Sequence, residues 1–137
     1  PLYSSAASDV YKRQVTGTDD AHHDLDDYDS VAGAPNPDAD LALGVTHAPY
    51  RRVLDRFAAD DYSLVLAGHT HGGQICLPGE RALVTNADID RERASGLHRY
   101  GDMWLEVSNG LGTSKFAPVR IFCRPSAALL TLTPRED

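Results

Sequence analysis

Residues 64–74 read LVLAGHTHGGQ, from Leu64 to Gln74. The four leading apolar residues predict a short strand that is buried on both faces of a sheet. Gly68 ends this strand and leaves room for a close approach to the backbone. His69 and His71 follow at the carboxyl end of the strand, where an open α/β sheet places its ligands. Imidazole is also a common protein ligand of metal ions near neutral pH.

A second apolar run precedes this stretch. Residues 41–46 (LALGVT) predict another buried strand, and His47 comes directly after it. Pro49 suits the first turn of a helix, and residues 50–60 place their apolar side chains on one face, as an amphipathic helix does. The order strand, helix, strand makes the two strands parallel, with a right-handed crossover.

Parallel strands end at the same edge of a sheet. His47 and His69 therefore converge on one rim, although 22 positions separate them, and His71 lies beside them. A bare His-x-His pair also fits a polar loop with no metal, since short motifs match by chance. The convergence favours the other interpretation, in which His47, His69 and His71 are metal ligands.

An acidic segment lies nearer the start of the chain. Residues 15–18 are expected to form a short strand, and six aspartates follow between Asp19 and Asp29, with His22 and His23 among them. Their spacing does not fit an EF-hand loop, which needs a glycine at position six and a glutamate at position twelve. We therefore predict a solvated acidic loop at this point.

The last third of the chain predicts short strands. Residues 97–100 and 103–108 flank Gly101-Asp102, a suitable two-residue hairpin turn. Residues 119–123 and 127–133 are expected to form a final hairpin, in a sheet that packs against the first.

The composition is that of a globular domain. The chain has 137 residues, of which 42% are hydrophobic and 24% charged, and its net charge of −7 does not favour nucleic-acid binding. No run of about 18 apolar residues predicts a transmembrane helix. Cys76 and Cys123 lie far apart in sequence, and we interpret both as reduced, buried residues.

The first 14 residues, PLYSSAASDVYKRQ, show neither helical nor strand periodicity. They resemble a peptide found at the ends of unrelated conceptual translations of draft genomes. We expect residues 1–14 to be a non-native segment and residues 15–137 to be the folded part.

Four motifs occur in an order that resembles a known family. They are THAP (46–49), GHTHGGQ (68–74), LVTN (83–86) and SNGLG (108–112). The first two resemble the last two metal-binding motifs of the calcineurin-like metallophosphoesterases, and the others resemble its bacterial YkuE/YaeI-like branch. The resemblance extends over residues 15–134.

This resemblance implies an α/β fold, specifically the C-terminal part of a four-layer α/β/β/α sandwich with mixed sheets. It implies two divalent metal ions (Mn, Zn or Fe) in the intact protein, with His47 and His69 on one ion and His71 on the other. The bridged pair would activate water for hydrolysis of a phosphomonoester or phosphodiester. The substrate would be a phosphate ester, either lipid-linked or nucleotide-like.

The other family motifs, D-x-H, G-D-x-x-D and G-N-H-[DE], do not occur in this sequence. We therefore expect the chain to be the C-terminal half of such an enzyme, with little or no activity alone. Two alternatives stay open. One is a mononuclear zinc hydrolase with a three-histidine site. The other is a non-catalytic fragment of a pseudo-enzyme.

Overall fold

The computed structural model describes residues 12–133 and centres on one mixed sheet of five strands. The strand order is β1-β2-β3-β7-β6, in which the first four strands are parallel and β6 is antiparallel to β7. The strands are β1 (Arg13–Gly17), β2 (Leu41–Val45), β3 (Leu64–Ala67), β6 (Gly96–Tyr100) and β7 (Met103–Val107). The α/β class predicted from the sequence is confirmed.

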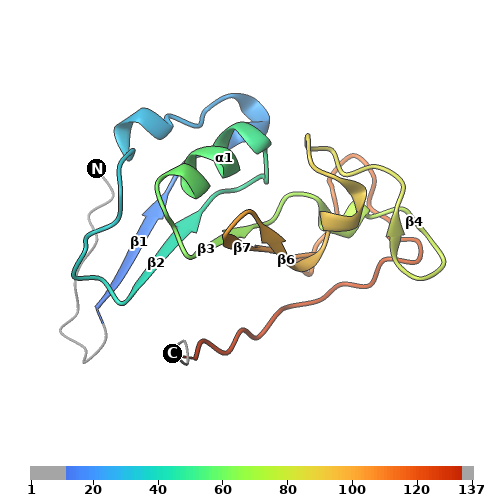
Figure 1. Cartoon of the computed structure of the whole chain (residues 1–137). Coiled ribbons are helices and arrows are strands. Elements are labelled where there is room, and N and C mark those ends of the chain that lie inside the picture. Colours follow the sequence, from blue (N-terminus) through green and yellow to red (C-terminus); the bar gives the residue numbers. More distant parts are fainter. Residues whose placement is uncertain (1–11, 134–137) are drawn as a thin grey trace.

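Helix α1 (Arg51–Ala59) connects β2 to β3 and covers one face of the sheet (Figure 1). Its buried side chains Val53, Leu54 and Phe57 pack on the strands, as the amphipathic pattern predicts. Gly44 lets the helix come close, because a Cβ at this position would lie 2.9 Å from the Phe57 ring. The strand–helix–strand unit and its parallel strands are therefore confirmed.

Among residues 12–133, no helix covers the opposite face of the sheet. Because successive side chains of a strand alternate between faces, Val15, Val45, Leu97 and Trp104 point away from α1. All four are exposed. The C-terminal part of the chain passes along this side of the sheet (Figure 1). A second sheet stacked on the first is not among residues 12–133, so the sandwich stays a prediction.

The predicted hairpin of β6 and β7 is confirmed, and Gly101 supplies the positive φ (61°) that its turn needs. The smaller β4 (Cys76–Leu77) and β5 (Arg81–Ala82) form a separate antiparallel ribbon. Four short 3₁₀ turns complete the regular structure of the described residues: η1 (Ala21–His23), η2 (Tyr28–Ser30), η3 (His71–Gly73) and η4 (Arg91–Arg93).

The predicted final hairpin is wrong. Residues 119–123 and 127–133 form no strands, and the β-pairing of this segment with other described residues is limited to isolated bridges such as Ile75–Ile121. Phe122 has a φ of 50°, which interrupts the extended run of residues 119–123. Apolar, β-branched composition alone could not reveal this break.

Strand β1 begins at Arg13, two residues before the expected start of the folded part. Arg13 and Gln14 pair with Leu41 and Ala42 of β2. The remainder of the expected non-native segment, residues 1–11, lies outside the described residues. Within residues 12–133, no helix is both long and apolar enough to cross a membrane.

Candidate functional site

Two of the three predicted ligands meet at the rim of the sheet. Strands β2 and β3 are paired in parallel, and the amide of Gly68 donates to the carbonyl of His47 over 3.0 Å. This bond aligns the two loops beyond the strand ends. As a result, His47 Nε2 lies 3.0 Å from His69 Nδ1. The convergence that the strand order predicts is present for this pair.

His69 is held in a defined orientation. Its backbone has a φ of 67°, and its Nε2 lies 3.1 Å from the carbonyl oxygen of Asn86. A carbonyl only accepts, so Nε2 carries the hydrogen and the Nδ1 of neutral His69 presents a lone pair to His47. Burial lowers the pKa of His69, and the neighbouring His22 and His47 lower it further. A neutral ring is the form that binds a metal ion.

His71 is held separately, by Gln74. The His71 Nδ1 lies 2.9 Å from Gln74 Oε1, which also accepts from the Ser114 amide at 2.7 Å. The Gln74 Nε2 donates to the Ala117 carbonyl at 2.6 Å, which fixes which end of the amide faces His71. Nδ1 therefore carries the hydrogen, and the lone pair of His71 lies on Nε2.

The backbone of His71 is held by Arg120, a residue that the sequence analysis did not single out. The Arg120 guanidinium donates to the carbonyls of His71 (2.9 Å), Asn109 (2.7 Å) and Gly110 (3.2 Å), and also to Gly112. Five donors on one planar group can satisfy several loop carbonyls at once. No local pattern identifies this role, because the carbonyls come from segments distant in sequence.

His22 lies beside His69 and joins it and His47 in a histidine cluster. The sequence analysis did not place His22 there. Its ring centroid lies 4.3 Å from that of His69, and its Nδ1 lies 3.0 Å from the Tyr50 hydroxyl. A signal existed: β1 is parallel to β2, so the loop after β1 reaches the same rim as His47.

Asp20 shapes the loop that carries His22. Its carboxylate caps the η1 turn by accepting from the His22 amide at 2.8 Å, and it contacts His23 Nδ1 at 2.6 Å. Burial alone would raise the pKa of Asp20, but these hydrogen bonds outweigh burial and lower it. A carboxylate that stays ionised therefore lies close to the histidine cluster.

The acidic loop is largely exposed to solvent, as the sequence predicts, with the Asp24 and Asp29 side chains 88% and 83% exposed. Three of its aspartates also pair with arginines of α1. Arg52 donates to Asp24 at 2.8 Å and to Asp26 at 2.6 Å, and Arg56 pairs with Asp29. The positively charged face of α1 supplies the partners of these carboxylates. The pairing fixes the loop over the helix.

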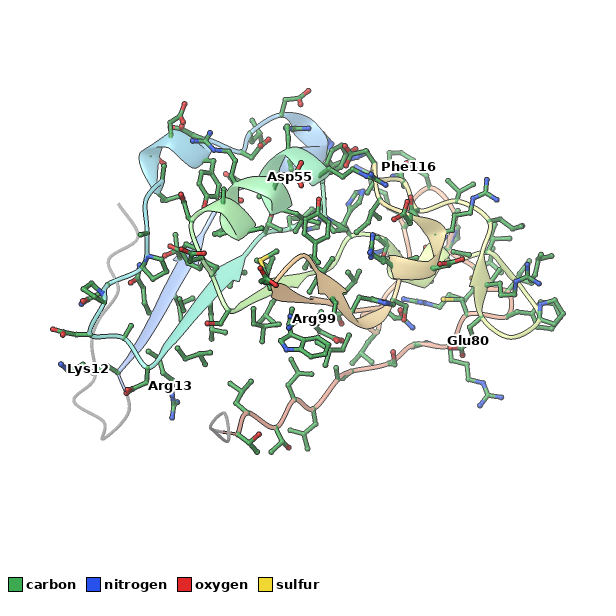
Figure 2. All side chains as sticks on the ribbon, viewed as in Figure 1. Lys12, Arg13, Asp55, Glu80, Arg99 and Phe116 are labelled. Carbon is green, nitrogen blue, oxygen red and sulfur yellow. The ribbon has the colours of Figure 1, made fainter. Side chains whose placement is uncertain are left out.

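A cleft of about 690 Å³ adjoins the histidines. Its lining includes His22, His69 and His71, together with Val84 and the strongly exposed Phe116 (Figure 2). His47 is not among its lining residues.

The described residues fit a metal ion only in part. Two ligand nitrogens on a tetrahedral zinc ion lie about 3.3 Å apart, close to the 3.0 Å between His47 Nε2 and His69 Nδ1. However, residues 12–133 contain no group of three or more His, Cys, Asp or Glu side chains arranged to hold a metal ion. The two imidazoles are an incomplete donor set.

Comparison with known proteins gives partial matches to curated bacterial proteins. The chain is 34% identical over 70 residues to the metallophosphoesterase YkuE of Bacillus subtilis, covering 51% of this chain and 24% of YkuE. It is 31% identical over 101 residues to the phosphodiesterase YaeI of Escherichia coli, covering 72% of this chain and 35% of YaeI. It is 29% identical over 130 residues to YpbG of Bacillus subtilis, covering 89% of this chain and 42% of YpbG.

These matches show that the chain is related to the metallophosphoesterases. The resemblance drawn from the His47 and His69–Gln74 motifs is thereby confirmed. The chain spans between about a quarter and two-fifths of the length of these three relatives. No family model matches the chain, and no solved structure matches it.

Proposed function

We propose that this chain supplies the C-terminal metal ligands of a metal-dependent phosphoesterase. In the longer protein, His47 and His69 would bind one divalent ion and His71 a second, and the ions would be Mn, Zn or Fe. The carboxylates and remaining ligands would come from outside this chain. The chain alone would have little or no activity.

The separation of the His47 and His69 nitrogens is the observation that supports this proposal best. The separation is set by two paired parallel strands and by the backbone bond from Gly68 to His47. His71 is independently held with its Nε2 lone pair available. The relationship to YkuE and YaeI points to the same chemistry.

A pair of divalent ions supplies an activated water and stabilises the charge on the phosphoryl oxygens. The residues of this chain have a positioning role. Asn86 fixes the hydrogen on one His69 nitrogen, and Gln74 fixes it on one His71 nitrogen. Such outer partners orient metal-binding imidazoles and strengthen ligation.

The proposed substrate is a phosphomonoester or phosphodiester. YaeI is named a phosphodiesterase, which favours the diester for a related chain. Lipid-linked and nucleotide-like esters are the two classes to compare in an assay of the longer protein.

Metal binding to the chain itself tests the ligand assignment. We expect Mn²⁺ or Zn²⁺ to bind weakly in calorimetric titrations, and His47→Ala or His69→Ala to weaken binding at least tenfold. His98→Ala is the matched control, because His98 lies on β6 and contacts the Ser95 carbonyl at 2.7 Å. Equal loss in all three variants would contradict the assignment.

Hydrolysis of bis-p-nitrophenyl phosphate tests the expected inactivity. With added Mn²⁺, we expect the chain to hydrolyse this diester no faster than buffer with Mn²⁺. A rate comparable with that of a full-length relative would refute the need for ligands from outside the chain. In the longer protein, one bound ion per chain would favour the mononuclear alternative.

A further inference from the structure

Cys76 and Cys123 come from distant parts of the chain but lie together behind the metal-binding motif. Cys76 is in β4 and is 3% exposed, and Cys123 is in the C-terminal segment and is 4% exposed. Their thiols donate to the same carbonyl, that of Gly72, at 3.2 and 3.4 Å. Burial and the neighbouring Cys123 raise the pKa of the Cys76 thiol to about 11. Both are free thiols.

Backbone pairing brings these two cysteines together. The Cys76 amide donates to the Ile121 carbonyl at 2.9 Å, and Ile75 and Ile121 form a parallel bridge. The turn at Gly72 also packs closely against the Cys123 side chain. A Cβ at Gly72 would lie 2.7 Å from the Cys123 Sγ. The two side chains are therefore neighbours in a small, well-packed cluster.

We propose that Cys76 and Cys123 are a redox-active pair that closes into an intramolecular disulfide. The oxidant is a small-molecule disulfide such as oxidised glutathione. The Cys123 thiolate attacks one sulfur of this molecule and displaces a thiolate. Cys76, as thiolate, then attacks the Cys123 sulfur of the mixed disulfide and displaces the second thiolate. Two protein thiols lose two protons and two electrons, and one small disulfide becomes two thiols.

Cys123 is the residue that the oxidant reaches first. It lies in a segment with no regular strand or helix, between Phe122 and Arg124, which are both exposed. The Arg120 guanidinium lies 3.6 Å from the Cys123 Sγ. Opening of this segment exposes Cys123 without unfolding the five-stranded sheet.

Closure would link two parts of the candidate site covalently. Cys76 follows the turn that carries His71, and Cys123 follows Arg120, which donates to the His71 carbonyl. The Cys123 thiol itself donates to the same carbonyl at 3.0 Å. A disulfide would therefore hold the C-terminal segment against the His71 turn and restrict the motion of both.

The purified chain, incubated with oxidised glutathione at low protein concentration, tests the proposal. After quenching and alkylation under denaturing conditions, we expect a monomer two hydrogens lighter that takes up no alkylating agent. Peptide mapping should join Cys76 to Cys123. The oxidised chain should melt about 10 °C higher than the reduced chain. Hydrogen exchange at residues 71–74 should slow.

Cys76→Ser and Cys123→Ser are the matched controls, and both should give only reduced chain or mixed disulfide with glutathione. The proposal is overturned if both thiols of the unmodified chain stay alkylatable, if each carries glutathione without a cross-link, or if only intermolecular disulfides form. None of these readouts depends on metal binding or hydrolysis, so the proposal stands or falls apart from the phosphoesterase assignment.

Discussion

Adding one methyl group at Gly44 tests how closely α1 must pack on the sheet that carries the histidines. In Gly44→Ala, the new Cβ would lie 2.8 Å from Val65 Cγ2 and 2.9 Å from two atoms of the Phe57 ring. Val65 and Phe57 are completely buried, so neither can move into open space. Overpacking of this kind costs about 1–3 kcal/mol. Reduced freedom of the unfolded chain returns about 0.4–1 kcal/mol.

We therefore expect Gly44→Ala to lower the free energy of unfolding by about 1–2 kcal/mol. Urea titration followed by fluorescence of Trp104, the only tryptophan, measures this difference, because Trp104 is paired with Leu64 of the central β3. Gly112→Ala is the matched control, since a Cβ there meets no atom within 4 Å. An unchanged midpoint for Gly44→Ala, or equal losses in both variants, would refute the close-packing argument.

Three further predictions follow from the side-chain contacts. Gln74→Leu removes the acceptor of His71 Nδ1–H, so ¹⁵N NMR should show a mixture of His71 tautomers in place of one; an unchanged spectrum would contradict the assignment. Burial raises the pKa of Glu106, so ionisation of this side chain opposes folding. Glu106→Gln should therefore have a higher free energy of unfolding than the unmodified chain at pH values above the pKa of folded Glu106, and this difference should vanish as the pH falls to the ordinary glutamate pKa. A difference in the free energy of unfolding that does not change with pH would contradict this. Arg120→Ala leaves several loop carbonyls without a donor, and urea titration should show a free energy of unfolding lower by about 1–3 kcal/mol. The control is Arg124→Ala, at an exposed side chain, which should change the free energy of unfolding by less than about 0.5 kcal/mol.

The central strand–helix–strand unit could be predicted because each of its signals is local. The apolar runs before His47 and His69 and the one-sided pattern of α1 needed no knowledge of distant residues. The connection between the strands then fixed their direction, and direction fixed the shared rim. The His47–His69 contact follows from these steps and the Gly68 backbone bond.

The parts that could not be predicted depend on contacts between distant segments. Arg120 binds carbonyls 8 to 49 positions away, and the break at Phe122 is visible only in its positive φ. Cys76 and Cys123 looked unrelated because 47 positions separate them, yet backbone pairing beside Ile121 makes them neighbours.

The two halves of the candidate site differ in what holds them. His47 and His69 are fixed by the central strands of the sheet, which bury their core against α1. His71 is fixed by Gln74 and Arg120, whose contacts lie in loops and in the short η3 turn. Loops with few buried contacts open at lower free energy than central strands do. Local opening should therefore displace His71 before it separates His47 from His69. The proposed second metal-binding position is thus more sensitive than the first to change in the C-terminal segment.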